Sequence, residues 1–317
     1  MKKLAAFFST KFCSESVVSQ WSLYAHRVFI KERNIYSEAY GRHNLIDFLH
    51  ARGLIATLDF VMPYARSPVL EFYCNLVSSS IGDGSFAKYG RMFVRDVIYD
   101  FSPYAINEFY NTPMEGEEDD IPDIDAITSV LTDGLITQFS THPKQLAAAT
   151  LKFFNSVLHK TAIRNWTPSN TIVVTRPQAV TLFTIGTGRL YNFGQLVFNT
   201  ILQFAEGRLK STNIPFPSLI FWKLESQGLL KEDDETLSDA SETLKIAPAY
   251  FNGNRKLDIL WSASGVATGV GNTRRPHLSP LLKAISCSLP HIYKHTFTLV
   301  CSRSKGQRCR ILRRPSG

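Results

Sequence analysis

The sequence predicts a mainly α-helical protein: a single multi-helix domain with one small β-hairpin and a disordered basic C-terminal tail. Three observations support this fold class. Apolar residues recur at helical spacing through most of residues 21–230. A short stretch near 85–100 alternates apolar and polar residues, as paired strands do. Beyond residue 261, small residues, prolines and arginines replace the helical pattern.

The first helices are predicted from apolar spacing and from residues that begin helices. Residues 1–20 are weakly patterned, so we expect a loose N-terminal arm. From residue 21 to about 54 the pattern is helical. The segment SPVLEFYCNLV (67–77) has Ser67 as a predicted N-cap and Pro68 at the first helical position.

The middle of the chain contains the hairpin, a further helix and a dense acidic run. Gly90 separates the two short alternating runs of the hairpin. In FSPYAINEFYNTP, Ser102 and Pro103 predict a capped helix start. The stretch 115–125 then places seven carboxylates in eleven positions. Like charges this dense repel one another, so a solvated surface loop is expected there rather than a metal site.

Further helices follow the acidic loop. IDAITSVLTDGL is one, and residues 142–161, rich in alanine and leucine, are another. Residues 176–208 are expected to form two helices, interrupted by glycines. The last predicted helix starts at Pro217 and ends at Gly228. The residues expected in the core are Phe48, Leu49, Phe72, Leu76, Ile106, Phe109, Phe154, Leu158, Leu182, Phe198, Ile201, Leu219 and Trp222.

The charge is distributed unevenly. The net charge is +8, but residues 262–317 hold ten of the 35 basic residues and no acidic one. The first 261 residues therefore carry 25 Lys and Arg against 27 Asp and Glu, a net charge of −2. We accordingly expect an acidic linker and weakly ordered segment at 231–261 and a basic tail at 262–317.

No catalytic, cofactor-binding or metal-binding residue is predicted. The five cysteines form no CxxC pair, and the eight histidines are dispersed. IGTGRLYNFG contains a GxG, but glycines that break a helix explain it better than a dinucleotide loop does. Asp83, Asp96 and Asp100 are close in sequence, and a polar rim on the hairpin accounts for them.

The basic tail is open to two interpretations. Its arginines and lysines could contact nucleic-acid phosphates or serve as a nuclear localisation signal. Alternatively, the tail is simply solvated, or is the product of a frame change. The candidate phosphate contacts are Arg303, Lys305, Arg308, Arg310, Arg313 and Arg314.

Composition also bears on the environment of the protein. No apolar stretch reaches the roughly 18 residues that cross a bilayer, so no membrane partner is expected. The first apolar run is too short for a signal peptide, and the unpaired cysteine count suits a reducing compartment. We expect an intracellular protein, with the nucleus as one option.

The order of several motifs resembles a known family. FLHARGL, SPVLEFYCNLV, GRMFVRDVIYDFSPYAINEFYNTP, KFFNSVLHKTAIRNWTPSN and FPSLIFWKLESQGLL follow one another over residues 25–230. This run is similar to the plant transposon protein domain, a family associated with retroelements, and to first-reading-frame products of Athila-type retrotransposons. The resemblance implies a mainly helical fold and supplies no catalytic residues.

Three function classes follow. The leading hypothesis is a non-enzymatic, gag-like structural or protein-interaction module, acting by self-association or on another protein, with no small-molecule substrate or cofactor. The alternative is a nucleic-acid-binding protein that uses the tail. A nuclease or transposase is the third, and the chain lacks the strand scaffold that presents an acidic triad in such enzymes.

Overall fold

The structure is a computed structural model. It describes residues 11–12, 15–35, 45–76, 90–114, 121–141, 145–169, 173–207, 213–230 and 232–245. All of these belong to one unit of the chain, Met1–Val270. The predicted basic tail and its six candidate phosphate contacts lie outside the described residues.

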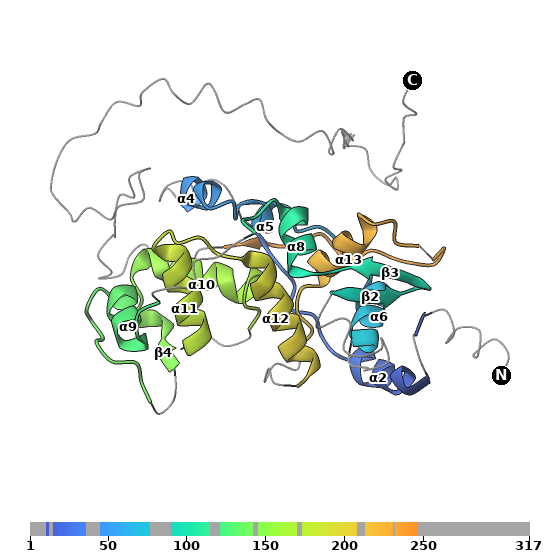
Figure 1. The fold of residues 1–317 in the computed structure, drawn as a ribbon, viewed down its shortest axis with the longest axis horizontal. Coiled ribbons are helices and arrows are strands. Elements are labelled where there is room, and N and C mark those ends of the chain that lie inside the picture. The colour runs from blue at the N-terminus through green and yellow to red at the C-terminus, as the bar shows by residue number, and fades with distance from the viewer. Residues whose placement is uncertain are drawn as a thin grey trace, which may run out of the picture. The chain divides into compact units, whose positions relative to one another are not determined.

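Helices dominate the described part, which confirms the predicted fold class (Figure 1). The α-helices are α2 (Glu15–Ala25), α4 (Leu45–Ala51), α5 (Ala56–Asp59), α6 (Arg66–Leu76), α8 (Pro103–Tyr110), α9 (Ile124–Thr132), α10 (Phe153–Asn165), α11 (Arg176–Gly186), α12 (Phe193–Ala205) and α13 (Pro217–Glu225). A short 3-10 helix, η2 (Ala148–Thr150), precedes α10.

The strands of the described part form three two-stranded sheets. The predicted hairpin is present as β2 (Arg91–Val94) and β3 (Val97–Asp100), which pair antiparallel. Its turn lies at Arg95 and Asp96, both in the left-handed region, rather than at Gly90. Two further pairs were not predicted: β1 (Asn34–Ile35) runs parallel to β6 (Thr243–Leu244), and β4 (Gln145–Ala147) runs antiparallel to β5 (Val173–Thr175).

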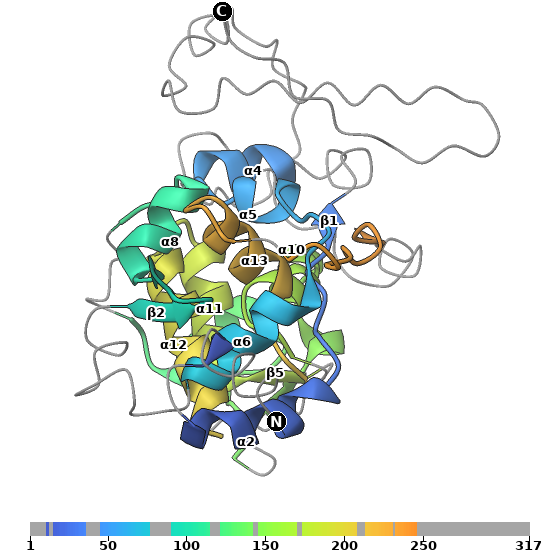
Figure 2. The ribbon, with the colours of Figure 1, turned by 90° about the vertical axis from the view of Figure 1, so that its right-hand side faces the viewer.

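Helix α6 lies at the centre of the packing, and every residue from Pro68 to Leu76 is buried. It contacts α2, β2 and α13, and Figure 2 shows it between α2 below and α13 above. The Phe72 ring packs 4.8 Å from that of Phe101, and the Tyr73 ring 5.1 Å from that of Phe204. The two buried polar side chains of α6, Glu71 and Asn75, have ion-pair or hydrogen-bond partners, as burial in a core requires.

The predicted core is largely correct. Eleven of the thirteen expected residues are buried, whereas Phe109 and Trp222 are partly buried and pack against the cluster. Trp222 sits at this boundary because its indole Nε1 donates to the Pro63 carbonyl, 2.8 Å away. The aromatic run before Gly228 therefore completes the core, as the sequence suggests.

A predicted cap followed by proline marks the start of α8 correctly but not that of α6. Ser102 accepts a hydrogen bond from the Ala105 amide and caps α8. Ser67 does not cap α6, because the helix begins one residue earlier, at Arg66. The Ser67 hydroxyl instead donates to the Glu71 carboxylate at 2.9 Å.

The loose arm predicted for residues 1–20 is wrong for the described part of that range. Helix α2 begins at Glu15, and Phe12 and Val17 are buried in the core. The Phe12 ring packs edge-on against Trp21 at 5.7 Å. Val17, Trp21 and Tyr24 recur at helical spacing, so the helix was predictable, and the pattern was divided by the boundary placed at residue 20.

The helix predicted for 142–161 is correct only in its second half. Residues 145–147 form β4, and α10 begins at Phe153. Alanine and leucine favour a helix, but propensity is a weak preference that tertiary pairing overrides. Here Leu146 is buried and pairs with Val174 of β5, which holds the segment extended.

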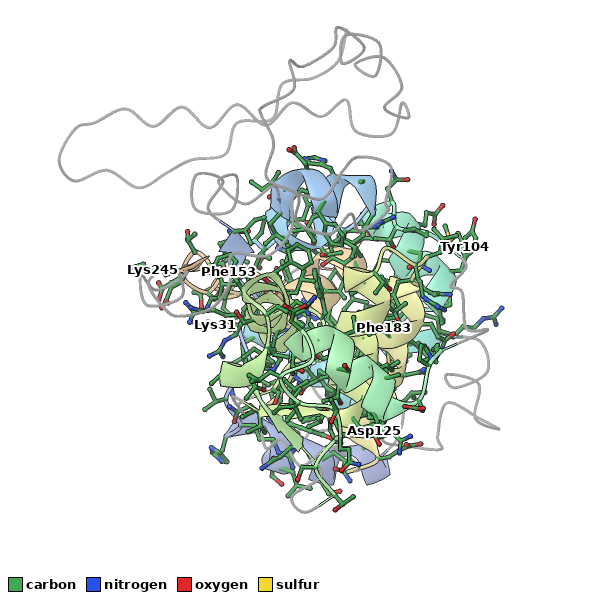
Figure 3. All side chains as sticks on the ribbon, turned by 90° about the vertical axis from the view of Figure 1, so that its left-hand side faces the viewer. Lys31, Tyr104, Asp125, Phe153, Phe183 and Lys245 are labelled. Carbon is green, nitrogen blue, oxygen red and sulfur yellow. The ribbon has the colours of Figure 1, made fainter. Side chains whose placement is uncertain are left out.

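The prediction of an acidic linker from residue 231 onward is wrong for residues 232–245, which are part of the fold. Glu232 and Glu235 form ion pairs with buried cations, and Thr243–Leu244 forms β6. We name residues 232–245 the C-terminal strap. The Arg33 guanidinium, which pairs with Glu242 of the strap, lowers the pKa of that carboxyl, and the charges of Lys31 and Lys245, both labelled in Figure 3, add to the effect. The strap is part of the fold because its carboxylates have specific partners.

Candidate functional site

A cavity of about 330 Å³ lies where the C-terminal ends of α4, α8 and α11 meet. We call it the Arg52 cavity. Figures 1 and 2 show α4, α5 and α8 as neighbours on one side of the described part. Its lining residues are Ala51, Arg52, Gly53, Leu54, Asn111, Thr112, Pro113, Ile185, Arg189, Leu190 and Tyr191.

Buried Asn107, on α8, fixes the walls of the cavity. Its Oδ1 accepts from the Thr112 hydroxyl at 2.8 Å and from the Gly194 amide at 2.6 Å. Its Nδ2 donates to Asn192, which in turn donates to the Met114 carbonyl. One buried amide thereby joins the end of α8 to the start of α12, and such fully paired networks impose a single geometry.

The Arg52 guanidinium is held in a defined position. Its Cζ lies 5.4 Å from the centroid of the Phe48 ring. On another side it contacts Gly188, where a Cβ would lie only 1.8 Å from Arg52 Nη2. Gly188 also has a φ of +82°, so both its backbone and its neighbour exclude a side chain. The second glycine of the GxG motif, Gly188, is therefore required because the Arg52 side chain packs against its backbone.

Arg189 and Tyr191 complete the polar lining. Arg189 Cζ lies 5.6 Å from the ring centroid of Phe183, a residue of α11 labelled in Figure 3. The Tyr191 hydroxyl lies 3.2 Å from the Thr181 hydroxyl. Burial raises the pKa of Tyr191 to about 12, so the phenol stays protonated at neutral pH.

A second polar cluster is buried under the C-terminal strap. Glu71 is fully buried and lies 3.5 Å from Lys11 Nζ and 3.3 Å from Arg95 Nε. The strap adds Glu232, 2.6 Å from Lys11, and Glu235, paired with Arg95. Desolvation raises the pKa of Glu71, although the charges of Arg95 and Lys11 oppose that rise. We call these five residues the buried ion cluster.

Glu32 is a second buried carboxylate. Its oxygens accept from the Ser218 and Leu219 amides, at 3.2 and 3.0 Å, at the start of α13. A carboxylate in this position satisfies two amides that a helix leaves unpaired. Burial nevertheless raises the pKa of Glu32 to about 7. The side chain therefore caps a core helix from a distant part of the chain.

His159 is buried on α10, and its Nε2 has no hydrogen-bond partner among the described residues. Burial lowers the pKa of this imidazole to about 4, and a hydrogen bond to the Val173 backbone offsets part of that effect. The neutral ring packs beside β5, where it helps to hold the unpredicted sheet.

Three of the carboxylates considered in the sequence analysis lie in the described residues and accept hydrogen bonds from backbone amides. Asp123 caps α9 by accepting from the Asp125 and Ala126 amides, and Asp125 accepts from the Phe139 amide. Asp100 accepts from the Ser102 amide at 2.9 Å. Residues 115–120 and Asp83 lie outside the described residues. Within the described ranges, no three His, Cys, Asp or Glu side chains gather as metal ligands.

Sequence reasoning missed the Arg52 cavity. Its two arginines are 137 positions apart, and the motifs that contain them, FLHARGL and IGTGRLYNFG, gave no sign that the two meet. The signal that was available is GTGR at 186–189, whose glycines do lie beside Arg52 but were assigned only to helix termination. No described helix is both long and apolar enough to span a bilayer.

The fold and its buried charges define a helical domain completed by flanking segments. A family model, Putative plant retrotransposon-related domain, matches residues 50–229, more than half of the 317-residue chain. The chain therefore belongs to this plant retrotransposon-related domain family, in agreement with the resemblance seen in its motifs. No curated protein and no solved structure matches the chain.

Proposed function

We propose that this retroelement-derived chain is a non-enzymatic, gag-like structural and protein-interaction module. The observation that supports the proposal is the placement of the buried carboxylates. Glu71 and Glu32 are only 0% and 4% exposed, and both hold distant segments together. A general acid or base must reach its substrate to transfer a proton, and these carboxylates are enclosed by other partners.

Self-association of the full chain tests this proposal. Multi-angle light scattering over a concentration series should reveal assemblies larger than a monomer. The same samples should be incubated with DNA and with magnesium or manganese. A monomer at every concentration that cleaves DNA only when the metal is present would contradict the proposal.

A second candidate function is binding of nucleic acid through the tail. The observation that favours it is the concentration of ten basic residues, without an acidic one, in residues 262–317. Affinity that arises from phosphate contacts falls steeply with salt, by a logarithmic slope of about 0.7 to 0.9 per contact.

This candidate is tested in the full chain with two matched variants. One changes four tail residues to glutamine: Arg308, Arg310, Arg313 and Arg314. The control changes four exposed basic residues of the body: Lys31, Arg91, Arg176 and Lys245. If the tail binds nucleic acid, the tail variant should lower the salt slope by up to about 3 to 4, and the body variant should leave it nearly unchanged. Equal slopes in both variants would refute a role for the tail.

A further inference from the structure

The Arg52 cavity presents positive charge to solvent. Two of its lining residues are arginines, and none is an aspartate or glutamate. Ala51, Asn111 and Leu190 are exposed, so the cavity opens at the surface. Its volume of about 330 Å³ falls at the lower end of the range typical of small-molecule sites, roughly 300–1,000 Å³.

We propose that this cavity binds a small oxyanion-bearing ligand, a carboxylate or phosphate compound, with Arg52 as its principal contact. This inference is independent of the gag-like role proposed above. It rests on the position of Arg52, on the absence of an ion-pair partner for its guanidinium among the described residues and on the charge of the lining.

Arg52 has an unsatisfied donor. Its Nε is buried and makes no hydrogen bond with any described residue. A buried N–H without a partner is costly, and the planar guanidinium fork matches the two oxygens of a carboxylate or phosphate. An oxyanion in the cavity would balance the charge of the guanidinium, which forms no ion pair with a described carboxylate.

The guanidinium needs little reorganisation to accept such a ligand. Phe48 supports one side of it, and the Gly188 backbone lies against another. A side chain that is already fixed loses less entropy on binding. Tyr191 and Arg189 line the same cavity, and Arg189 adds a second positive charge to it.

Helix ends do not cancel this charge. The C-terminal ends of α4, α8 and α11 carry partial negative charge on unpaired carbonyls. Here backbone amides already cap those carbonyls: Leu54 N donates to Leu49 O, Thr112 N to Asn107 O and Arg189 N to Thr184 O. Arg52 is therefore not needed to satisfy the end of α4, and it contributes its positive charge to the cavity lining.

The test is isothermal titration calorimetry on the full chain at low salt. The probes are citrate, inorganic phosphate and, as a neutral control, glycerol. Binding of citrate, phosphate or both should weaken at least about tenfold in Arg52→Gln, because a charge-assisted contact is lost. Arg176→Gln, which removes an exposed arginine of α11 outside the cavity, should bind as the wild type does. The probe whose affinity depends on Arg52 identifies the ligand class.

Two further measurements keep the test decisive. Arg52→Lys retains the charge without the fork, so its affinity should lie between those of wild type and Arg52→Gln. Thermal unfolding of each variant verifies that the fold is intact. Anion binding by the basic tail would be common to all these proteins and cancels in the comparison. Equal affinity of wild type and a folded Arg52→Gln for both anions, or no binding by wild type, would overturn the proposal.

Discussion

Two buried side chains carry opposite pKa shifts over the same pH range. Burial raises the pKa of Glu32 to about 7 and lowers that of His159 to about 4. Between pH 4.5 and 7, Glu32 is protonated in the folded protein and ionised in the unfolded chain. Unfolding therefore releases a proton, and the contribution of Glu32 to stability falls as the pH rises. Between pH 4 and 6.5, unfolding binds a proton on His159, so this residue raises stability with pH. The two contributions nearly cancel in the wild type.

Single substitutions should separate these contributions. Relative to wild type, Glu32→Gln should gain free energy of unfolding as the pH rises from 4.5 to 7, by on the order of 2–3 kcal/mol. His159→Gln should gain relative stability as the pH falls from 6.5 to 4, by a similar amount. Urea unfolding at half-unit pH steps measures both. Parallel pH profiles for wild type and either variant would show that the group titrates normally in the folded protein.

At the scale of elements, the contact between α8 and α12 depends on one glycine. Gly194 lies in the first turn of α12, where a Cβ would lie 2.0 Å from the Pro103 carbonyl oxygen and 2.9 Å from Asn107 Cγ. Its amide also donates to Asn107. The close approach of the two helices, and the network that shapes the Arg52 cavity, therefore require glycine here.

Gly194→Ala should be strongly destabilising, by about 3 kcal/mol, because a backbone oxygen cannot move away cheaply. Gly134→Ala is the matched control. Gly134 has a φ of +76° with open space around it, so it should cost only about 1 kcal/mol of backbone strain. Chemical denaturation compares the two. A cost for Gly194→Ala no larger than that of Gly134→Ala would mean that the two helices are not in close contact.

Local signals explain which elements could be predicted. Ser102 with Pro103 marks α8, and the glycines between α11 and α12 mark the break, because caps and turns depend on neighbours in sequence. Strand β4 is held by Val173–Thr175, nearly thirty positions away, and no local pattern reports that partner. The Arg52 cavity could not be predicted for the same reason, because it forms only where the ends of three helices that are distant in sequence meet.

At the scale of the whole molecule, the matched domain is completed by flanks on both sides. Residues 50–229 contain α6 and α13, but Lys11, Phe12 and Glu32 precede them and the strap follows. The flanks also join each other: β1 pairs with β6, and the Ser241 hydroxyl donates to the Glu32 carbonyl at 2.6 Å. A segment read as a linker from its charge is in fact a partner of the N-terminal flank.

Removal of the N-terminal flank should therefore destabilise the fold. A chain that begins at residue 21 loses buried Phe12 and Val17 and one cation of the buried ion cluster. It also leaves the Asn75 side chain without the Lys11 carbonyl to which it donates. Compared with a chain that begins at residue 11, it should lose at least about 3 kcal/mol in urea unfolding. Equal stability would place residues 11–20 outside the cooperative unit.

The central claim is that buried, paired charges hold distant segments of this fold together. A double-mutant cycle on Glu71→Gln and Arg95→Met, with equilibrium unfolding as the readout, tests this claim most directly. We predict a coupling energy of at least about 2 kcal/mol, because either single change removes one of the few opposite charges that surround a buried ion. The exposed Arg33–Glu242 pair, in an equivalent cycle, should give less than about 1 kcal/mol. A coupling near zero between Glu71 and Arg95 would contradict the claim and would free Glu71 for another role.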